Sequence, residues 1–242
     1  MRERCVTRKA IAAGAVAALV SASAFAMSRD PGPPDHRQVT PGKFDHLTVA
    51  GPFVVRVRTG EKTSVSLSGP RTMLDDTELL VRDGQLIIRW QEGASWSRNG
   101  NEGVDVDISL PVMRGVTNLG AGSIDIDGVR ADHFIATLAS AGSVTIHSMN
   151  VGQLNAKLAG AGSLRTAGQV ESATVMLASS GSYDGADLTV ENADITSTGS
   201  GTVRATVTQT ATIRSFGSGG IELTGGAKCT VSSGGPGHVH CS

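Results

Sequence analysis

A short Gly-Ser phrase that returns at nearly constant spacing constrains this 242-residue chain more than any other feature. Each phrase opens on an apolar residue and contains a glycine three or four positions later. The apolar leaders, 18 to 20 residues apart, are Leu119, Leu138, Leu158, Leu177, Ile195, Ile213 and Val231. The glycines are Gly122, Gly142, Gly162, Gly181, Gly199, Gly217 and Gly234. A period near 20 residues with short β-type segments is typical of a solenoid of stacked coils.

Each repeat also carries a short run that alternates apolar and polar residues, such as Ile124–Asp127 and Val144–His147. Such alternation turns one set of side chains inward and the other outward. We expect the leaders to form one buried column in coils stacked about 4.8 Å apart. Each corner glycine should adopt a positive φ without steric cost. The serines expected to form a ladder beside the corner are Ser123, Ser143, Ser163, Ser182, Ser200 and Ser218.

Two alternatives to the solenoid are compatible with the same sequence features. A flexible Gly/Ser linker has no reason to keep an apolar column in register. A β-sandwich also contains regular short strands, and it is the main competing fold. The repeat favours an all-β, single-stranded parallel β-helix.

The first 26 residues have the layout of a secretory signal peptide. Four basic residues precede an apolar stretch from Ile11 to Val20, and residues 24–26 provide a small-residue cleavage site. That stretch is too short to span a membrane comfortably, so we expect export, cleavage near Ala26 and no membrane span in the mature chain. The mature chain would carry 17 Lys and Arg against 21 Asp and Glu. This mildly acidic balance does not favour binding to nucleic acid or anionic lipid.

Export leaves two cysteines, Cys229 and Cys241. An even pair in an oxidising compartment predicts a disulfide. A bridge between them would close the last coil and protect its unpaired strand edges. Cys229 precedes its leader by two residues, in the inward slot held earlier by Ala136, Ala156, Val175, Ala193 and Ala211.

Proline-rich residues 27–42 predict an extended linker. Residues 43–242 predict one domain, with an irregular β region over 44–118 and regular coils over 119–242. Within the irregular region, residues 79–90 predict a hairpin with an Asp-Gly turn. This region lacks the regular period, so we expect it to cap or begin the solenoid.

Three segments resemble, in their order, the putative auto-transporter adhesin, head GIN domain family. They are Phe44–Val57, Leu80–Ile88 and Val104–Pro111, the last of which leads into the Gly-Ser repeats. The resemblance covers about residues 44–240. It implies a single-stranded β-helix, right-handed, in an exported bacterial protein of unestablished biochemical role. No catalytic or binding residues of the family are available to transfer.

Two classes of function remain open. The favoured one is a non-enzymatic periplasmic or secreted protein for adhesion, binding or envelope scaffolding. Its partner would be an unknown envelope or extracellular protein or glycan, or a second copy of the chain. The alternative is a polysaccharide lyase or hydrolase, because parallel β-helices can carry such enzymes.

Glycan cleavage of that kind uses paired carboxylates. Asp105 with Asp107, and Asp125 with Asp127, share outward faces in the predicted strands. However, the coils contain no insertion that would build a cleft. Aromatic residues make up only 3% of the chain, which leaves little surface for stacking sugar rings. We therefore expect no catalytic residues and no cofactor.

Two further motifs carry weaker functional signals. His238 and His240 share a strand face at a spacing compatible with zinc or copper. Two ligands beside the chain end favour an exposed tail instead, so we expect no metal site. Trp90 and Trp96 flank a polar, Gly-rich segment. Trp90 is expected to pack under the hairpin, and Trp96 is the candidate partner contact.

Overall fold

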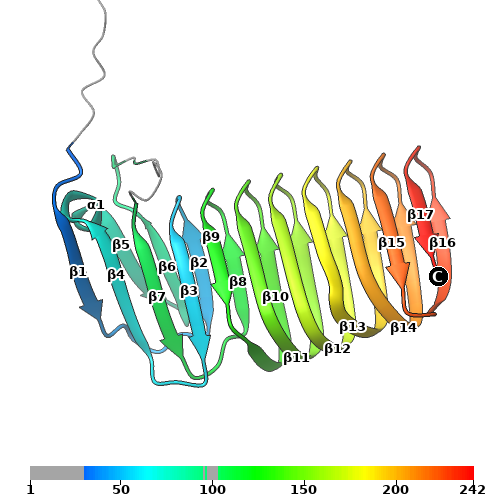
Figure 1. Cartoon of the computed structure of the whole chain (residues 1–242), viewed down its shortest axis with the longest axis horizontal. Coiled ribbons are helices and arrows are strands. Elements are labelled where there is room, and N and C mark those ends of the chain that lie inside the picture. The colour runs from blue at the N-terminus through cyan, green and yellow to red at the C-terminus, as the bar shows by residue number, and fades with distance from the viewer. Residues whose placement is uncertain (1–29, 95, 97–102) are drawn as a thin grey trace, which may run out of the picture. The chain divides into compact units, whose positions relative to one another are not determined.

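The computed structural model describes residues 30–94, 96 and 103–242. Residues 31–242 form one compact unit, and the predicted signal peptide, 1–26, lies outside the described residues. In the described part, 17 strands join in one sheet that winds into a β-solenoid (Figure 1). The all-β, solenoid fold is therefore confirmed. The described residues contain no helix long and apolar enough to cross a membrane.

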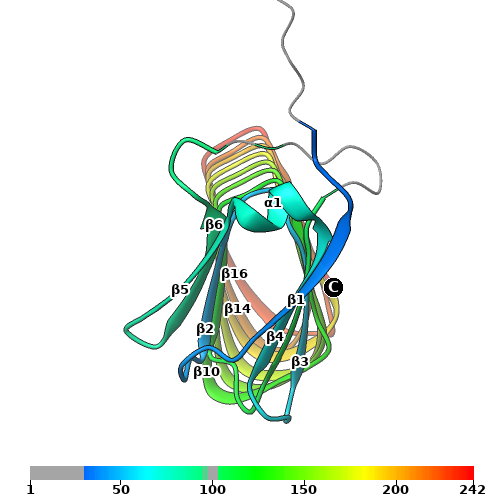
Figure 2. The same cartoon turned by 90° about the vertical axis from the view of Figure 1, so that its left-hand side faces the viewer.

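The regular part of the solenoid consists of parallel strands wound as coils with two flat sides (Figure 2). The Gly-Ser phrases form the corner, at the top of Figure 1, and the long strands bend around the opposite curve. The strands are β8 (Gly115–Asn118), β9 (Ser123–Ile126), β10 (Val129–Leu138), β11 (Ser143–Leu158), β12 (Ser163–Leu177), β13 (Ser182–Ser197), β14 (Thr202–Ser215), β15 (Gly220–Thr224), β16 (Lys228–Ser233) and β17 (His238–Cys241).

The N-terminal coils stack out of sequence order. β2 (His46–Ala50) and β3 (Val54–Thr59) form a coil with parallel neighbours on both sides. On one side it pairs with β8 and β9, and on the other with β6 (Gln85–Trp90) and β7 (Asp105–Leu110). The region before residue 118 therefore begins the solenoid, as expected.

Antiparallel strands and a short helix complete the N-terminal end. They are β1 (Pro34–Val39), β4 (Ser64–Pro70), α1 (Arg71–Asp75) and β5 (Thr77–Arg82). α1 lies across this end of the core, where Met73 and Leu74 are buried (Figure 2). β5 and β6 form the predicted hairpin, in which Asp83 adopts a positive φ of 51°.

β1 lies inside the segment predicted as a linker, 27–42. It pairs antiparallel with β4 along its whole length, and Arg37 forms an ion pair with Asp75. Prolines predict an extended backbone, but they carry no information about a distant strand edge that can pair with it. The structure therefore differs from the linker prediction over residues 34–39.

The leaders occupy two neighbouring inward columns. Leu138, Leu158 and Leu177 stack directly and are each 1% exposed. After Leu177 the register moves by two residues, because Ser197 takes the next position in this column and Ile195 pairs with Val175. The prediction of one continuous column is therefore wrong, although Ile195 and Ile213 are buried as expected.

The structure also differs from the prediction at the ends of the apolar column and of the serine ladder. Leu119 and Val231 are 50% and 46% exposed, because Asn118 takes the column position next to Leu138 and Val231 lies on the last coil. The serine ladder continues from Ser182 to Thr202 and Gly220, so Ser200 and Ser218 are not part of it. Its confirmed members are Ser123, Ser143, Ser163 and Ser182.

The corner glycines allow close approach between coils, and none of those in the Gly-Ser phrases has the positive φ that the sequence suggested. A Cβ on Gly162 would overlap the carbonyl oxygen of Gly142 and lie 2.9 Å from that of Ser140. The backbones of successive corners therefore leave no room for a methyl group. The prediction that these corners need glycine for a positive φ is therefore wrong. They need glycine because the backbone of the preceding coil lies too close for a side chain.

Tyr183 places a hydroxyl inside the mainly apolar core. The Tyr183 hydroxyl lies 3.0 Å from Oγ1 of Thr166, and the side chain is almost completely buried. Gly185 leaves space for the ring, since a Cβ there would lie 2.9 Å from it. Burial raises the pKa of Tyr183 from 10.0 to about 12, because the phenolate would lose its hydration.

This single tyrosine provides a direct test of the core. The native protein should retain the neutral phenol until the pH approaches about 12, whereas the unfolded chain ionises near 10.0. The associated stability is fully present below pH 10.0 and should be lost as the pH rises towards about 12. Ultraviolet titration of native and denatured protein checks this, and Tyr183→Phe should remove the loss. A native midpoint at the ordinary value would contradict the buried position.

Candidate binding groove

Three hollows adjoin along the curve of the solenoid and form one continuous depression, here called the polar groove. Their volumes are about 410, 590 and 280 Å³. The first two share Val112, Arg130 and Asn150. The second and third share Asn150, Gly152 and Glu171. The groove therefore crosses several successive coils.

The groove exists because the strands lose their regular register at the curve. The pairing of β11 with β12 shifts between Ile146 and Met149, and that of β12 with β13 shifts after Arg165. Gly152, which lines the second and third hollows, adds no side chain there, and a Cβ at this position would lie 2.8 Å from the carbonyl oxygen of Asp132. The irregular strand pairing and this glycine together produce the depression without any inserted loop. The sequence-based expectation of a surface without a cleft therefore misses this depression.

The lining of the second and third hollows is mainly polar and repeats from coil to coil, whereas Pro111, Val112, Met113 and Val129 make the first hollow more apolar. One outward column contains Arg130, Asn150, Gln169 and Thr189. A second contains His133 and Gln153, and it continues beside the groove through Ser172 and Asn192. The carboxylates of Asp132, Glu171 and Glu191 also line it. Amide and hydroxyl groups both donate and accept hydrogen bonds, so this lining suits a ligand with many hydroxyl groups.

Several of these groups are oriented by protein contacts. Nε2 of Gln209 donates to Oε2 of Glu191 at 3.0 Å. Oγ1 of Thr210 donates to Oδ1 of Asn192 at 2.6 Å. At the N-terminal end, Nε of Arg114 lies 3.3 Å from Oδ2 of Asp45. Contacts between coils thus restrain side chains along the groove.

The groove continues onto one flat side of the solenoid, here called the neutral face. This side is formed by β8, β10, β16 and the second halves of β11–β14. Among the carboxylates of these strands, that of Asp194 is paired with Arg214 at 2.7 Å. Most of its outward residues are uncharged and polar, and Lys157, Arg214 and the exposed Ile135 and Met176 lie among them. The uncharged polar ones include Asn155, Thr174, Thr212, Thr230, Thr137, Thr196 and Ser232.

The opposite side, here called the charged face, carries charges that pair with one another. Nη2 of Arg165 lies 2.7 Å from Asp187, and its pKa is raised by the hydrogen bond to Asp187 and by the charge of Asp184. Nε of Arg204 lies 3.0 Å from Glu222. The outward column of this face contains Arg56, Asp125, Thr145, Arg165, Asp184, Arg204, Glu222 and His240.

The carboxylates considered for catalysis lie at the N-terminal end of the charged face. β3 lies between β7 and β9, so Arg56 faces Asp107 on one side and Asp125 on the other. Arg56 lies 3.3 Å from Asp105 and 3.8 Å from Asp107. Asp125 contacts His147 at 2.8 Å, and Asp127 accepts a hydrogen bond from the Thr59 amide at 3.0 Å. Each of these carboxylates has a polar or charged partner in the fold.

The two tryptophans belong to the N-terminal end. Trp90 packs against Phe53 with ring centroids 4.5 Å apart. Trp96 is half-buried, and its Nε1 donates to Oδ2 of Asp76 at 2.8 Å. The role of Trp96 as a partner contact stays a prediction.

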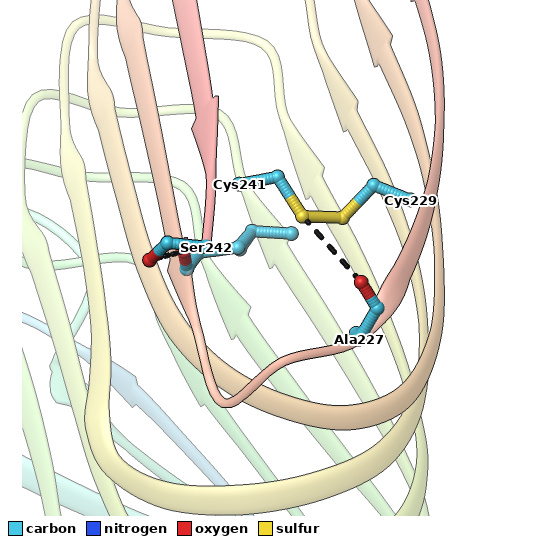
Figure 3. Close-up of a disulfide and its surroundings, with 5 residues drawn as sticks. Ala227, Cys229, Cys241 and Ser242 are labelled. Atoms are coloured by element: carbon cyan, nitrogen blue, oxygen red, sulfur yellow. Dashed lines mark hydrogen bonds between the residues drawn. A yellow bond between two sulfur atoms is a disulfide. The ribbon is translucent and has the colours of Figure 1, made fainter.

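Cys229 on β16 and Cys241 on β17 form the predicted disulfide across the last coil (Figure 3). Cys229 pairs with Ala211, which follows Ala193 and Ala173 in an inward column. Ala136 and Ala156 belong to the neighbouring column of Ile195, so the predicted slot is correct only for the later repeats. The bridge joins the two sides of the coil.

The groove residues are not among the candidate site residues predicted from the sequence. The signal that could have found them is the recurrence of exposed amide residues, such as Asn150, Gln153 and Gln169, between apolar positions of successive repeats. Their significance depends on the irregular register at the curve, which the repeat spacing does not show. Across the described ranges, no three His, Cys, Asp or Glu side chains are grouped as a metal ion would require.

Comparisons with known proteins agree with this architecture. The profile of a family described as putative auto-transporter adhesin, head GIN domain, matches residues 43–227. A putative adhesin from Bacteroides fragilis NCTC 9343 has a similar structure, with a TM-score of 0.78, 18% identity, and coverage of 87% of this chain and 97% of that one. No curated protein matches the chain.

Two further solved structures cover the same shares of the two chains, 87% and 97%. One is a putative lipid binding protein from Parabacteroides distasonis ATCC 8503, with a TM-score of 0.72 and 19% identity. The other is a putative adhesin from Parabacteroides merdae ATCC 43184, with a TM-score of 0.68 and 15% identity. At these identities the likeness concerns the fold.

Proposed function

Because this chain belongs to the putative auto-transporter adhesin, head GIN domain family, we propose that it is a non-enzymatic protein that binds an extended glycan. The glycan would lie in the polar groove and on the adjoining neutral face. The observation that carries this proposal is the continuity of the groove over successive coils, with amide and hydroxyl groups repeated along it.

The geometry suits a polymer better than an enclosed small molecule. Successive coils repeat their outward groups about every 4.8 Å, and an extended polysaccharide presents hydroxyl groups at a comparable interval along its length. The groove is shallow and open along the curve, whereas sites for small ligands usually enclose most of the ligand surface. A long chain could gain several weak hydrogen bonds by contacting one coil after another.

Two observations support a non-catalytic role. The carboxylates Asp105, Asp107, Asp125 and Asp127 have protein partners on the charged face. They also lie on another side of the solenoid from the polar residues of the neutral face. A lyase or hydrolase needs catalytic groups beside the bound polymer, so it would have to use Asp132, Glu171 or Glu191, which line the groove. Of these, Glu191 already accepts a hydrogen bond from Gln209.

We place this activity outside the cytoplasm, in the periplasm or in secreted protein. The disulfide between Cys229 and Cys241 supports an oxidising compartment. Export would follow from the predicted signal peptide over residues 1–26, with residues 43–242 acting as one binding domain.

The test is co-sedimentation of the oxidised chain from residue 27 onward with insoluble peptidoglycan, chitin and cellulose. We expect retention by at least one of them. The combined change of Asn150, Gln153 and Gln169 to alanine should weaken retention by at least about tenfold, because three hydrogen bonds contribute about 0.5–1.5 kcal/mol each. The exposed positions of these side chains should leave the fold intact.

A matched variant on the charged face provides the control. Changing Thr145, Ser163 and Thr202 to alanine also removes three outward polar groups, and it should leave retention unchanged. Equal losses in the two variants, or no loss in the groove variant, would contradict the proposed surface. Release of sugar fragments by the purified protein would contradict the non-enzymatic role.

A further inference from the structure

The last strand of the solenoid presents two imidazoles on a restrained backbone. The sequence suggested that His238 and His240 belong to an exposed tail. In the structure they lie on β17, which pairs in parallel with β15, and both side chains are exposed on the charged face. The adjacent Cys241 is tied to Cys229, so the strand is held at both its backbone and its end.

The neighbouring strand leaves space for one of the imidazoles. His238 pairs with Gly220, at the point where the serine ladder has given way to glycine. A Cβ on Gly220 would lie 2.8 Å from Cε1 and 2.9 Å from Nε2 of His238. The ring of His238 therefore lies over the backbone of β15, where a serine side chain would collide with it.

A carboxylate lies in register with the second imidazole. Glu222 pairs with His240, and both side chains point outward from neighbouring strands. Oε2 of Glu222 accepts a hydrogen bond from Nε of Arg204 at 3.0 Å. Rotation of the exposed Glu222 side chain about its own bonds would release it from Arg204 and direct it towards β17.

We propose that His238 and His240 bind one divalent transition-metal ion, with Glu222 leaving Arg204 to supply the third ligand. Imidazole nitrogens suit Zn²⁺, Cu²⁺ and Ni²⁺, and a carboxylate oxygen completes a common ligand set. Alternation along β17 keeps both rings on one side of the sheet. In the structure these three side chains are not grouped as a metal ion would require, so binding requires Glu222 to leave Arg204 and the two rings to converge on the ion. This site is independent of the glycan-binding proposal.

Calorimetric titration of the oxidised chain with metal chlorides tests the site. We expect one ion per chain, with Cu²⁺ bound more tightly than Ni²⁺ or Zn²⁺ and with no measurable binding of Ca²⁺ or Mg²⁺. His238→Ala and His240→Ala should each weaken Cu²⁺ binding by at least about tenfold, since chelation requires both rings. His133→Ala changes an exposed imidazole on another surface and should have no effect. Unchanged Cu²⁺ affinity in the His238→Ala, His240→Ala double variant would overturn the proposal.

The competing ion pair allows a gain-of-affinity test. Arg204→Gln removes the cation that holds Glu222, and it should tighten Cu²⁺ binding several-fold. Arg165→Gln removes an arginine from the same column two coils away, and it should leave the affinity unchanged. Glu222→Gln should weaken Cu²⁺ binding. Full retention of Cu²⁺ affinity in this variant would show that Glu222 is not a ligand. Paramagnetic resonance of the Cu²⁺-loaded chain should show two nitrogen ligands, and a spectrum without them would also overturn the proposal.

Discussion

Replacing Gly162 with alanine should reduce the free energy of unfolding by more than about 3 kcal/mol. In an ordinary position this change would stabilise a protein slightly, because alanine has fewer unfolded conformations to lose. At Gly162 the added methyl group would overlap the carbonyl oxygen of Gly142. It would also lie 3.0 Å from Cδ2 of Leu138, so that neither the backbone nor the core can give way easily. The steric cost at Gly162 therefore turns the usual small stabilisation by Gly→Ala into a destabilisation.

Urea unfolding monitored by circular dichroism measures this effect. Ala161→Val is the matched control, because it adds volume at the adjacent residue of the same corner, where the side chain is exposed. That variant should change the free energy of unfolding by less than about 0.5 kcal/mol. A Gly162→Ala protein as stable as the wild type would show that the corners are not packed backbone to backbone.

Removing the disulfide should destabilise the last coil by about 3 kcal/mol in the Cys229→Ser, Cys241→Ser double variant. The bridge closes a loop with a sequence separation of 12, and its loss restores conformational freedom to that segment in the unfolded state. Coils interact mainly with their neighbours, so the effect should be greatest at the C-terminal end. β16 and β17 should then open without unfolding of the central strands.

Amide hydrogen exchange distinguishes local opening from global unfolding. Protection should fall in residues 228–241 of the variant and remain close to wild type in β11 and β12. Reductant should reproduce the change in the wild-type chain and should have no effect on the double variant. Unchanged protection of β16 and β17 would contradict a stabilising role for the bridge. Opening of β17 in this variant should also weaken metal binding, because His238 and His240 lie on this strand.

The regular coils were predictable because each repeat contains all the information for one coil. Alternation around Ile124 and Val144 identified inward and outward positions, and Leu138, Leu158 and Leu177 are buried as expected. The even pair of cysteines expected after export indicated the bridge. These features depend on local patterns and on the stacking of similar neighbours, which a sequence displays directly.

The register after Leu177 was not predictable from the repeated phrase. Many corners contain two glycines separated by one residue, such as Gly199 and Gly201, and either can be aligned with Gly181. In the structure Gly201 lies against Gly181, while Gly199 lies against Ser179. The choice places the buried Ser197 beside Leu177 and keeps Ile195 beside Val175. Only the packing of whole coils decides between these alignments.

The candidate site shows the same division. Exposed residues such as Asn150 and Gln169 could be identified as outward-facing, but the groove that they line arises from shifts in strand pairing at the curve. Likewise, the spacing of His238 and His240 indicated a shared face, whereas their position opposite Gly220 and Glu222 depends on β15. The depth of the surface and the residues that face each other on adjacent coils cannot be read from the spacing of residues along one coil.

The winding of the chain into β-coils with an apolar interior follows from its residue pattern, because period-2 alternation and a repeat near 20 residues act within and between adjacent segments. The tertiary structure alone decided the order of the N-terminal coils, where β2 and β3 lie between strands that come later in the chain. Those strands carry no shared phrase to mark their partners. Their pairing is selected by the free energy of burying the whole core together.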